Sequence, residues 1–278
     1  MFGFFFKKNA CDIWDNLLHC ILLNLIAIVL VFGSIFLCLW TLALQGRAET
    51  FVYIFFYIAL ILCCMILNVF FFAEGENAAK VANFETPSYS RYFKNILPSI
   101  KDGFLFGFFQ GILISVALVS MPYYYHLYRP VDGSQGSIIY LLCMVFVFWF
   151  LLITALSMQW FIAVRSLMHN NFWKCVKKSY ILFFDNMGFT LGMTFVNILN
   201  LALTILTFGL VPGITGITFT SCNALRLRLY KYDWLEVNPD LSPKEQRQVP
   251  WKDLLAKDKK TLGPRKLKNI FKPWKDEK

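Results

Sequence analysis

The stretch NMGFTLGMTFVNILNLALTILTFGLVPGITGITFTSCNAL, residues 186–225, contains no acidic, basic or histidine side chain. Arg226, Arg228 and Lys231 follow it at once. A straight helix of about 40 residues would be roughly 60 Å long at 1.5 Å per residue, whereas the hydrocarbon core of a bilayer is about 30 Å thick. The stretch therefore predicts a polytopic membrane protein in which this segment crosses the bilayer twice, or crosses it once and then bends.

Four further charge-poor stretches precede this one, at 17–44, 51–72, 103–124 and 137–162. Each reaches the length of about 20 apolar residues that a helix needs to cross a bilayer. The whole chain is 58% hydrophobic, above the ~45–50% of soluble domains. Helices satisfy their own backbone hydrogen bonds in lipid, so we expect an all-α fold.

The last stretch contains its own break. Gly209, Pro212 and Gly213 lie close together, and glycine with proline ends a helix and favours a tight turn. We therefore divide it into spans at 187–207 and 211–225, joined by a hinge at these three residues. The second span is short, so the alternatives are a tilted or re-entrant element, or a helix that extends through Arg226 and Arg228, whose long side chains can reach the headgroups. The predicted fold is a polytopic helical membrane protein with about six transmembrane helices.

Basic residues between the spans alternate between rich and poor segments, and Lys and Arg are retained on the cytoplasmic side of a membrane. The rich segments are the N-terminus, the second and fourth loops, and the tail. This predicts an interfacial N-terminus at 1–16, a membrane domain at 17–229 and a basic tail at 230–278, with both termini cytoplasmic. Segments 91–100 and 171–184 combine lysines with apolar residues at helical spacing, which predicts short interfacial helices. The alternative, which we favour, is that each segment is a juxtamembrane elbow that leads into the next span.

The tail interleaves basic residues with tryptophan, which suits anionic lipid headgroups at the cytoplasmic face. Nucleic acid is not expected as a partner, because the tail is tethered beside the membrane. The residues that carry this prediction are Trp251, Lys252, Arg265, Lys266, Lys268 and Trp274.

Small residues recur every four positions in two of the spans, which lets helices approach closely in lipid. The first stripe is Gly103, Gly107, Gly111 and Ser115, and the second starts with Gly188 and Gly192. Both begin with a G-F-x-x-G pattern, so an alternative reading is a parallel internal repeat with a site between two related halves. We favour helix packing, either within the chain or to a membrane-protein partner or second copy.

Amide side chains are the main polar groups inside the spans. Six of them are candidates for lining a polar cavity: Asn24, Asn68, Gln110, Gln159, Asn197 and Asn200. The alternative is that each one hydrogen-bonds a neighbouring helix, which is the commoner use of amides in membrane proteins.

The sequence has no G-x-S-x-G, H-E-x-x-H or P-loop pattern, so we expect no enzymatic activity. None of its eight cysteines forms a C-x-x-C pair, and its three histidines are far apart in sequence. We therefore expect no metal and no cofactor.

Three segments resemble the YesL-like family of small bacterial membrane proteins, a domain of unknown function. They are Phe93-Lys94-Asn95 leading into 103–112, Asp15-Asn16 with Leu23-Asn24-Leu25, and the segment 223–233. The resemblance implies a bacterial inner (plasma) membrane protein, sometimes associated with carbohydrate uptake, and supplies no catalytic residues. We expect a scaffold or accessory subunit of a membrane assembly; the alternative is a small transporter or channel for a neutral or anionic solute.

Overall fold

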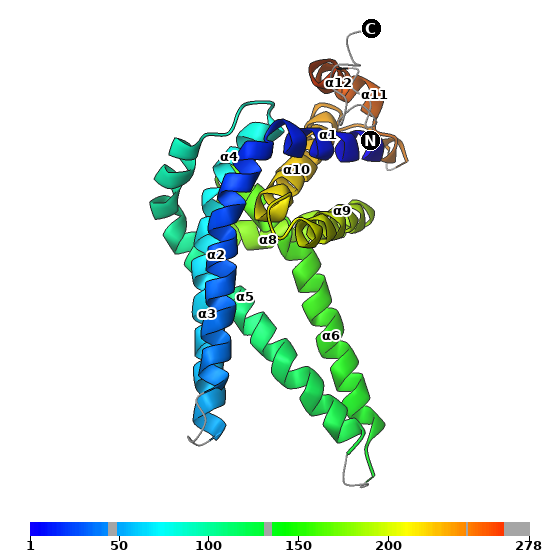
Figure 1. Cartoon of the computed structure of the whole chain (residues 1–278). Helices are drawn as coiled ribbons and strands as arrows, with labels where there is room; N and C mark the ends of the chain where they lie inside the picture. The colour runs from blue at the N-terminus through cyan, green and yellow to red at the C-terminus, as the bar shows by residue number, and fades with distance from the viewer. Residues whose placement is uncertain (44–48, 131–134, 243, 264–278) are drawn as a thin grey trace.

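The computed structural model describes residues 1–43, 49–130, 135–242 and 244–263, and within these ranges the chain forms helices and no strand (Figure 1). The first six helices are α1 (Phe2–Asp15), α2 (Leu17–Leu42), α3 (Glu49–Ala73), α4 (Gly75–Ala82), α5 (Tyr89–Tyr128) and α6 (Ile138–Met158). They are followed by α7 (Phe161–Met168), α8 (Phe172–Asp185), α9 (Met187–Leu206), α10 (Gly213–Val237), α11 (Trp251–Leu254) and α12 (Ala256–Leu262). A short 3-10 turn, Glu245–Arg247, precedes α11.

Five helical segments in the described chain are long and apolar enough to cross a membrane. They are Leu17–Leu42, Phe51–Ala82, Tyr89–Tyr128, Ile138–Met168 and Met187–Leu206. Little of each is buried inside the protein, and their outer faces carry exposed leucine, isoleucine and phenylalanine. Such apolar surfaces need lipid as their solvent, so the chain is an all-helical membrane protein.

The long helices form two pairs that diverge along their length (Figure 1). Helix α2 lies beside α3, and α5 packs on α3 before it leans away to meet α6 at the end opposite α1. Helix α9 runs across the direction of α2 and α3 rather than along it.

Helix α5 contains both the basic amphipathic segment 91–100 and the predicted span at 103–124. The two are one continuous helix of 40 residues that contains Pro98 and Pro122, so segment 91–100 leads into the span rather than forming a separate interfacial helix. At 1.5 Å per residue it is about 60 Å long, so part of it must extend beyond the hydrocarbon core. The second predicted interfacial helix, at 171–184, is α8.

Helix α10 contains most of the sixth predicted span. It continues from Gly213 past Arg226 and Arg228 to Val237, as one of the alternatives for that span predicted, and it is not among the helices long and apolar enough to cross a membrane. Every residue from Thr218 to Leu225 is buried in protein rather than facing outward. A helix covered on all sides by α1, α4, α7 and α9 needs no apolar outer face, which explains its many threonine and serine residues.

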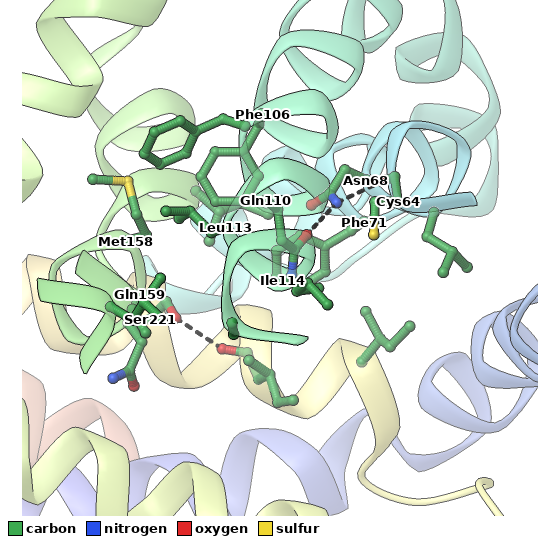
Figure 2. Close-up of a pocket in the computed structure, with 18 of the residues that line it drawn as sticks. Cys64, Asn68, Phe71, Phe106, Gln110, Leu113, Ile114, Met158, Gln159 and Ser221 are labelled. Carbon is green, nitrogen blue, oxygen red and sulfur yellow. Dashed lines mark hydrogen bonds between the residues drawn. The ribbon is translucent and has the colours of Figure 1, made fainter. Parts of the chain in front are cut away.

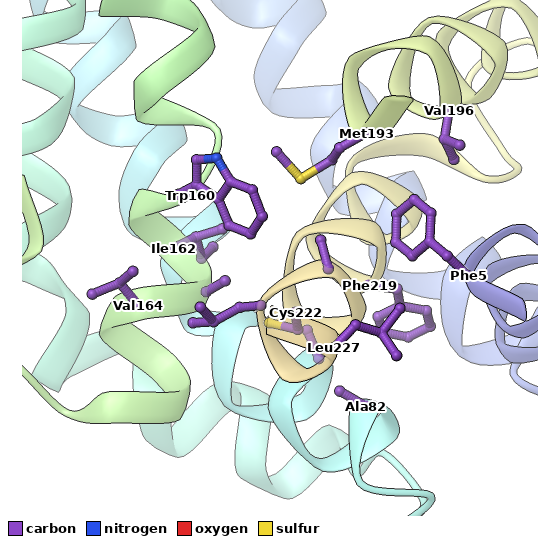
Figure 3. Packing of buried hydrophobic residues seen from close by; sticks show 14 of the residues in the cluster. Phe5, Ala82, Trp160, Ile162, Val164, Met193, Val196, Phe219, Cys222 and Leu227 are labelled. Atoms are coloured by element: carbon purple, nitrogen blue, oxygen red, sulfur yellow. The ribbon is translucent and has the colours of Figure 1, made fainter. Parts of the chain in front are cut away.

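A compact layer of short helices around α10 closes one end of the long helices. Its core contains the fully buried side chains of Phe5, Trp160, Met193 and Phe219, which converge from four parts of the chain (Figure 3). Packing of this kind holds α1 and α9 onto α10.

The tail begins later than predicted and docks onto this layer. Because α10 runs to Val237, residue 230 is not a boundary. Leu255 and Leu262 are buried in the core, and Lys7 donates a hydrogen bond to the Gly263 carbonyl at 3.2 Å. The N-terminal helix and the described part of the tail therefore lie at the same end of the molecule.

Candidate functional site

The first glycine stripe lies against the backbone of α3. A Cβ atom added at Gly103 would lie 2.7 Å from the Val69 Cα, and one added at Gly111 would lie 2.9 Å from the Ile61 Cα. Between them, a Cβ on Gly107 would collide with the backbone of Cys64 and Met65. Only glycine permits this approach, so the stripe fixes where α5 crosses α3.

Ser115, the last member of that stripe, hydrogen-bonds within its own helix by donating to the Gly111 carbonyl at 2.8 Å.

The second stripe does not pack on the backbone of another helix in the same way. Nothing lies within 4 Å of a Cβ placed on Gly188, and a Cβ on Gly192 would collide with the ring of Phe2. The shared G-F-x-x-G pattern therefore has two different environments within the chain, and packing of the second stripe on a partner or second copy stays a prediction.

The hinge residues form a tight turn between α9 and α10. Gly209 and Gly213 have φ values of +89° and +61°, in the region that favours glycine, and the Val211–Pro212 peptide bond is cis. A Cβ on Gly213 would collide with the side chain of Asn24 on α2. The turn is thus held against α2 as well as joining its own two helices.

The six candidate amides do not converge on one site. Asn24 donates to the carbonyls of Leu210 and Pro212, both at 2.8 Å, and accepts from the Thr215 hydroxyl at 3.1 Å. Asn200 donates to the Thr220 hydroxyl on α10 at 3.0 Å.

The other four amides form two further groups. Asn68 on α3 donates to the Gln110 Oε1 on α5 at 2.6 Å. Gln159 accepts from Asn197 at 3.0 Å and donates to the Thr194 hydroxyl at 2.8 Å, both on α9. All six amides therefore hydrogen-bond a neighbouring helix or the turn that leads into one.

Replacing Asn24 with leucine should lower the free energy of unfolding by about 2 kcal/mol, because buried carbonyls at the hinge would lose their donors. The measurement is thermal unfolding of the purified full chain. Asn95→Leu is the matched control: its Nδ2 is buried with no hydrogen-bond partner among the described residues, so that change should be neutral or stabilising. Equal losses in the two variants would contradict the interpretation of Asn24.

A cavity of about 660 Å³ lies where α5 and α6 separate toward the compact layer. Its walls come from α2, α3, α5, α6, α7 and α10 (Figure 2). Asn68 and Gln110 lie on one wall, and Gln159 and Ser221 lie on another. The remaining lining is aliphatic and aromatic apart from Cys64 and Met158, and among the described residues no charged side chain lines the cavity. Three of the six candidate amides thus share a cavity, whereas Asn24, Asn197 and Asn200 do not line it.

Two buried contacts of an acidic side chain, one with a histidine and one with a lysine, lie in the compact layer, and the sequence analysis did not predict them. The His19 Nε2 lies 2.9 Å from the Glu74 Oε1, and the Lys8 Nζ lies 2.9 Å from the Asp12 Oδ2, with all four residues buried. In the sequence, Asp12 and Glu74 lie at the ends of apolar runs, which marks them as unusual carboxylates. Their position does not indicate which side chains they contact.

Two arginines form hydrogen bonds in the same layer. The Arg165 Nε donates to the Asp102 Oδ2 at 2.8 Å. The Arg228 guanidinium lies 3.9 Å from the centre of the Phe189 ring and donates to the Asn186 Oδ1 at 3.1 Å. Burial lowers the pKa of Arg228 to about 10, so this side chain stays positively charged at neutral pH. These contacts cross-link helices rather than facing a cavity.

The predicted membrane-surface tail is described only in part. Trp251 is half-buried with its ring 5.2 Å from the Arg228 guanidinium, and Lys252 is exposed. Arg265, Lys266, Lys268 and Trp274 lie outside the described residues. Trp251 thus contacts the protein core, which leaves Lys252 as the described member of this set that faces outward.

No group of three His, Cys, Asp or Glu side chains in the described ranges could hold a metal ion. Comparison with protein families, curated proteins and solved structures gives no match for this chain. The class of the protein therefore rests on its fold and its apolar helices. It is a helical membrane protein, and its described residues include five helices that could cross a bilayer.

Proposed function

We propose that this chain is a non-enzymatic integral membrane protein that acts as a scaffold or accessory subunit of a membrane assembly. The observation that supports it is the use of the intramembrane amides. Each of the six bonds a neighbouring helix or its adjoining turn, as a rigid helical framework requires, and in the described residues no charged side chain lies in the central cavity. Transport paths for ions and protons usually carry such groups.

The same proposal includes location and partners. The docking of α12 near α1 supports two termini on one side, and basic loops on that side favour the cytoplasm. Exposed Trp173 and Lys174 on α8 fit a surface that lies in anionic lipid headgroups. Membership of the YesL-like family, and with it a bacterial inner membrane, is part of this proposal.

The scaffold proposal is tested by comparing two preparations of the full chain. In native membranes it should migrate as a discrete species larger than the purified protein, with a membrane-protein partner or second copies. In proteoliposomes it should give no more swelling than empty liposomes with neutral or anionic solutes. Swelling above that baseline would overturn the proposal.

A small transporter or channel is the second candidate, favoured by the cavity that Asn68, Gln110 and Gln159 share. Cysteine labelling in intact vesicles separates the two. Ala117 lines the cavity, whereas Ser137 is exposed at the start of α6, at the end opposite α1. We expect a membrane-impermeant thiol reagent to label Ser137→Cys and to leave Ala117→Cys at the level of the unaltered chain.

Labelling of Ala117→Cys at a rate similar to that of Ser137→Cys would show a water-filled path and favour the transporter. Protection of Ser137→Cys from the outer face, with labelling only after the vesicles are opened, would instead contradict the proposed orientation.

A further inference from the structure

The central cavity has the shape and chemistry of a site for hydrocarbon. Glycine contacts from Gly103 to Gly111 hold α5 on α3. The cavity lies at the level of these contacts, in the wedge that α5 and α6 leave as they separate toward the compact layer (Figure 1), and α3 and α10 close it. We propose that it holds one acyl chain of a membrane lipid, a ligand site distinct from any scaffold surface.

The size of the cavity fits one chain. Ligand pockets usually measure about 300–1,000 Å³, and this one measures about 660 Å³. It is also several times larger than the roughly 150 Å³ apolar cavity that stays dry and binds benzene. A space of this size, left empty, would deprive its walls of many dispersion contacts.

Most polar groups of the lining already have partners. The Asn68 Nδ2 donates to the Gln110 Oε1, Gln159 bonds Thr194, and the Ser221 hydroxyl donates to the Ile217 carbonyl at 3.0 Å. The Gln110 Nε2 is left as a donor without a partner among the described residues. Water is held in a cavity only where it finds two to four polar partners. The lining offers few free ones, so hydrocarbon is favoured over water or a polar solute.

The route into the cavity leads from the bilayer. Ala155 on α6 lines the cavity and is also exposed, which marks an opening between the helices. The neighbouring outer surfaces of α5 and α6 carry apolar side chains such as Val119 and Trp149, both about half exposed. A chain can therefore enter sideways from lipid without passing a polar surface.

The test counts lipid retained by the purified full chain. After mild extraction and a delipidating wash, native mass spectrometry should find one phospholipid per unaltered protein. Ala117→Trp, which fills the cavity from α5, should lower that retention at least tenfold. Val119→Trp is the matched control, two residues further along the same helix on the lipid-facing side, and it should retain lipid like the unaltered chain.

Ala155→Trp fills the cavity from α6 without touching the glycine contacts, and it decides the question if Ala117→Trp does not fold. Mass increments separate a membrane lipid from bound detergent. An unaltered chain that carries no lipid or only detergent would overturn the proposal, as would cavity-filling variants that retain lipid like the control.

Discussion

Gly107→Leu should push α5 away from α3 and destabilise the membrane domain. The new side chain would start inside the backbone of Cys64 and Met65, which cannot move aside as a flexible side chain can. Overpacking usually costs about 1–3 kcal/mol and occasionally more. Because this clash is with backbone, we expect a cost at or above about 3 kcal/mol. For a chain of this size, a loss of about 3 kcal/mol corresponds to roughly 6–12 °C in melting temperature. Thermal unfolding of the purified full chain measures it.

The matched control is Gly188→Leu, the same change in another long apolar helix. A Cβ there meets nothing within 4 Å, so the variant should melt within a few degrees of the unaltered chain. Gly107→Ala gives a graded test, because the Cβ alone already collides. If Gly107→Leu melted like Gly188→Leu, the packing of α5 on α3 described above would be wrong.

The contrast between Gly107 and Gly188 also shows what the sequence can and cannot predict. The stretches that form α2, α3, α5 and α6 were recognisable, because lipid demands about 20 apolar residues whatever the tertiary contacts. The four-residue spacing of Gly103, Gly107 and Gly111 marks a face suited to close packing, but it does not say which helix lies opposite. Gly188 and Gly192 have the same spacing, and α9 makes no comparable backbone approach there.

Helix α10 shows the limit of the charge-based prediction. Its first half has no charged side chain, so it resembles a span, yet it is rich in threonine and is buried among other helices. Hydropathy and charge describe a helix by itself, whereas burial depends on its neighbours. For the same reason the pairing of Asn24 with Thr215, 191 positions later in the chain, could not be predicted.

A second large effect is expected in the compact layer, at the buried pair of Lys8 and Asp12 on α1. The Lys8 Nζ donates to both Asp12 oxygens, at 3.1 and 2.9 Å, and to the Val81 carbonyl at 3.2 Å. It also lies 3.9 Å from the centre of the Phe84 ring. The Asp12 Oδ2 accepts a further hydrogen bond from Asn223 on α10, at 2.7 Å. The pair thus joins α1 to two other parts of the layer.

Burial lowers the pKa of the Lys8 amine and raises the pKa of the Asp12 carboxyl, and the attraction between the two groups opposes both shifts. Each charge is therefore stable in the layer only while its partner is present. A buried charge that loses its partner usually costs about 3–5 kcal/mol, whereas replacing both partners with apolar residues is often neutral or stabilising.

Asp12→Ala should therefore lower the free energy of unfolding by about 3–5 kcal/mol, or roughly 6–20 °C in melting temperature. The double variant Lys8→Met/Asp12→Leu should recover most of that loss, because no unpaired charge remains and Asn223 keeps its 2.8 Å bond to the Asn9 side chain. Thermal unfolding of the full chain measures both. If the double variant were as unstable as Asp12→Ala, the unpaired charge of Lys8 would not be the cause of the loss. The interactions of the pair itself would then hold α1 on α10.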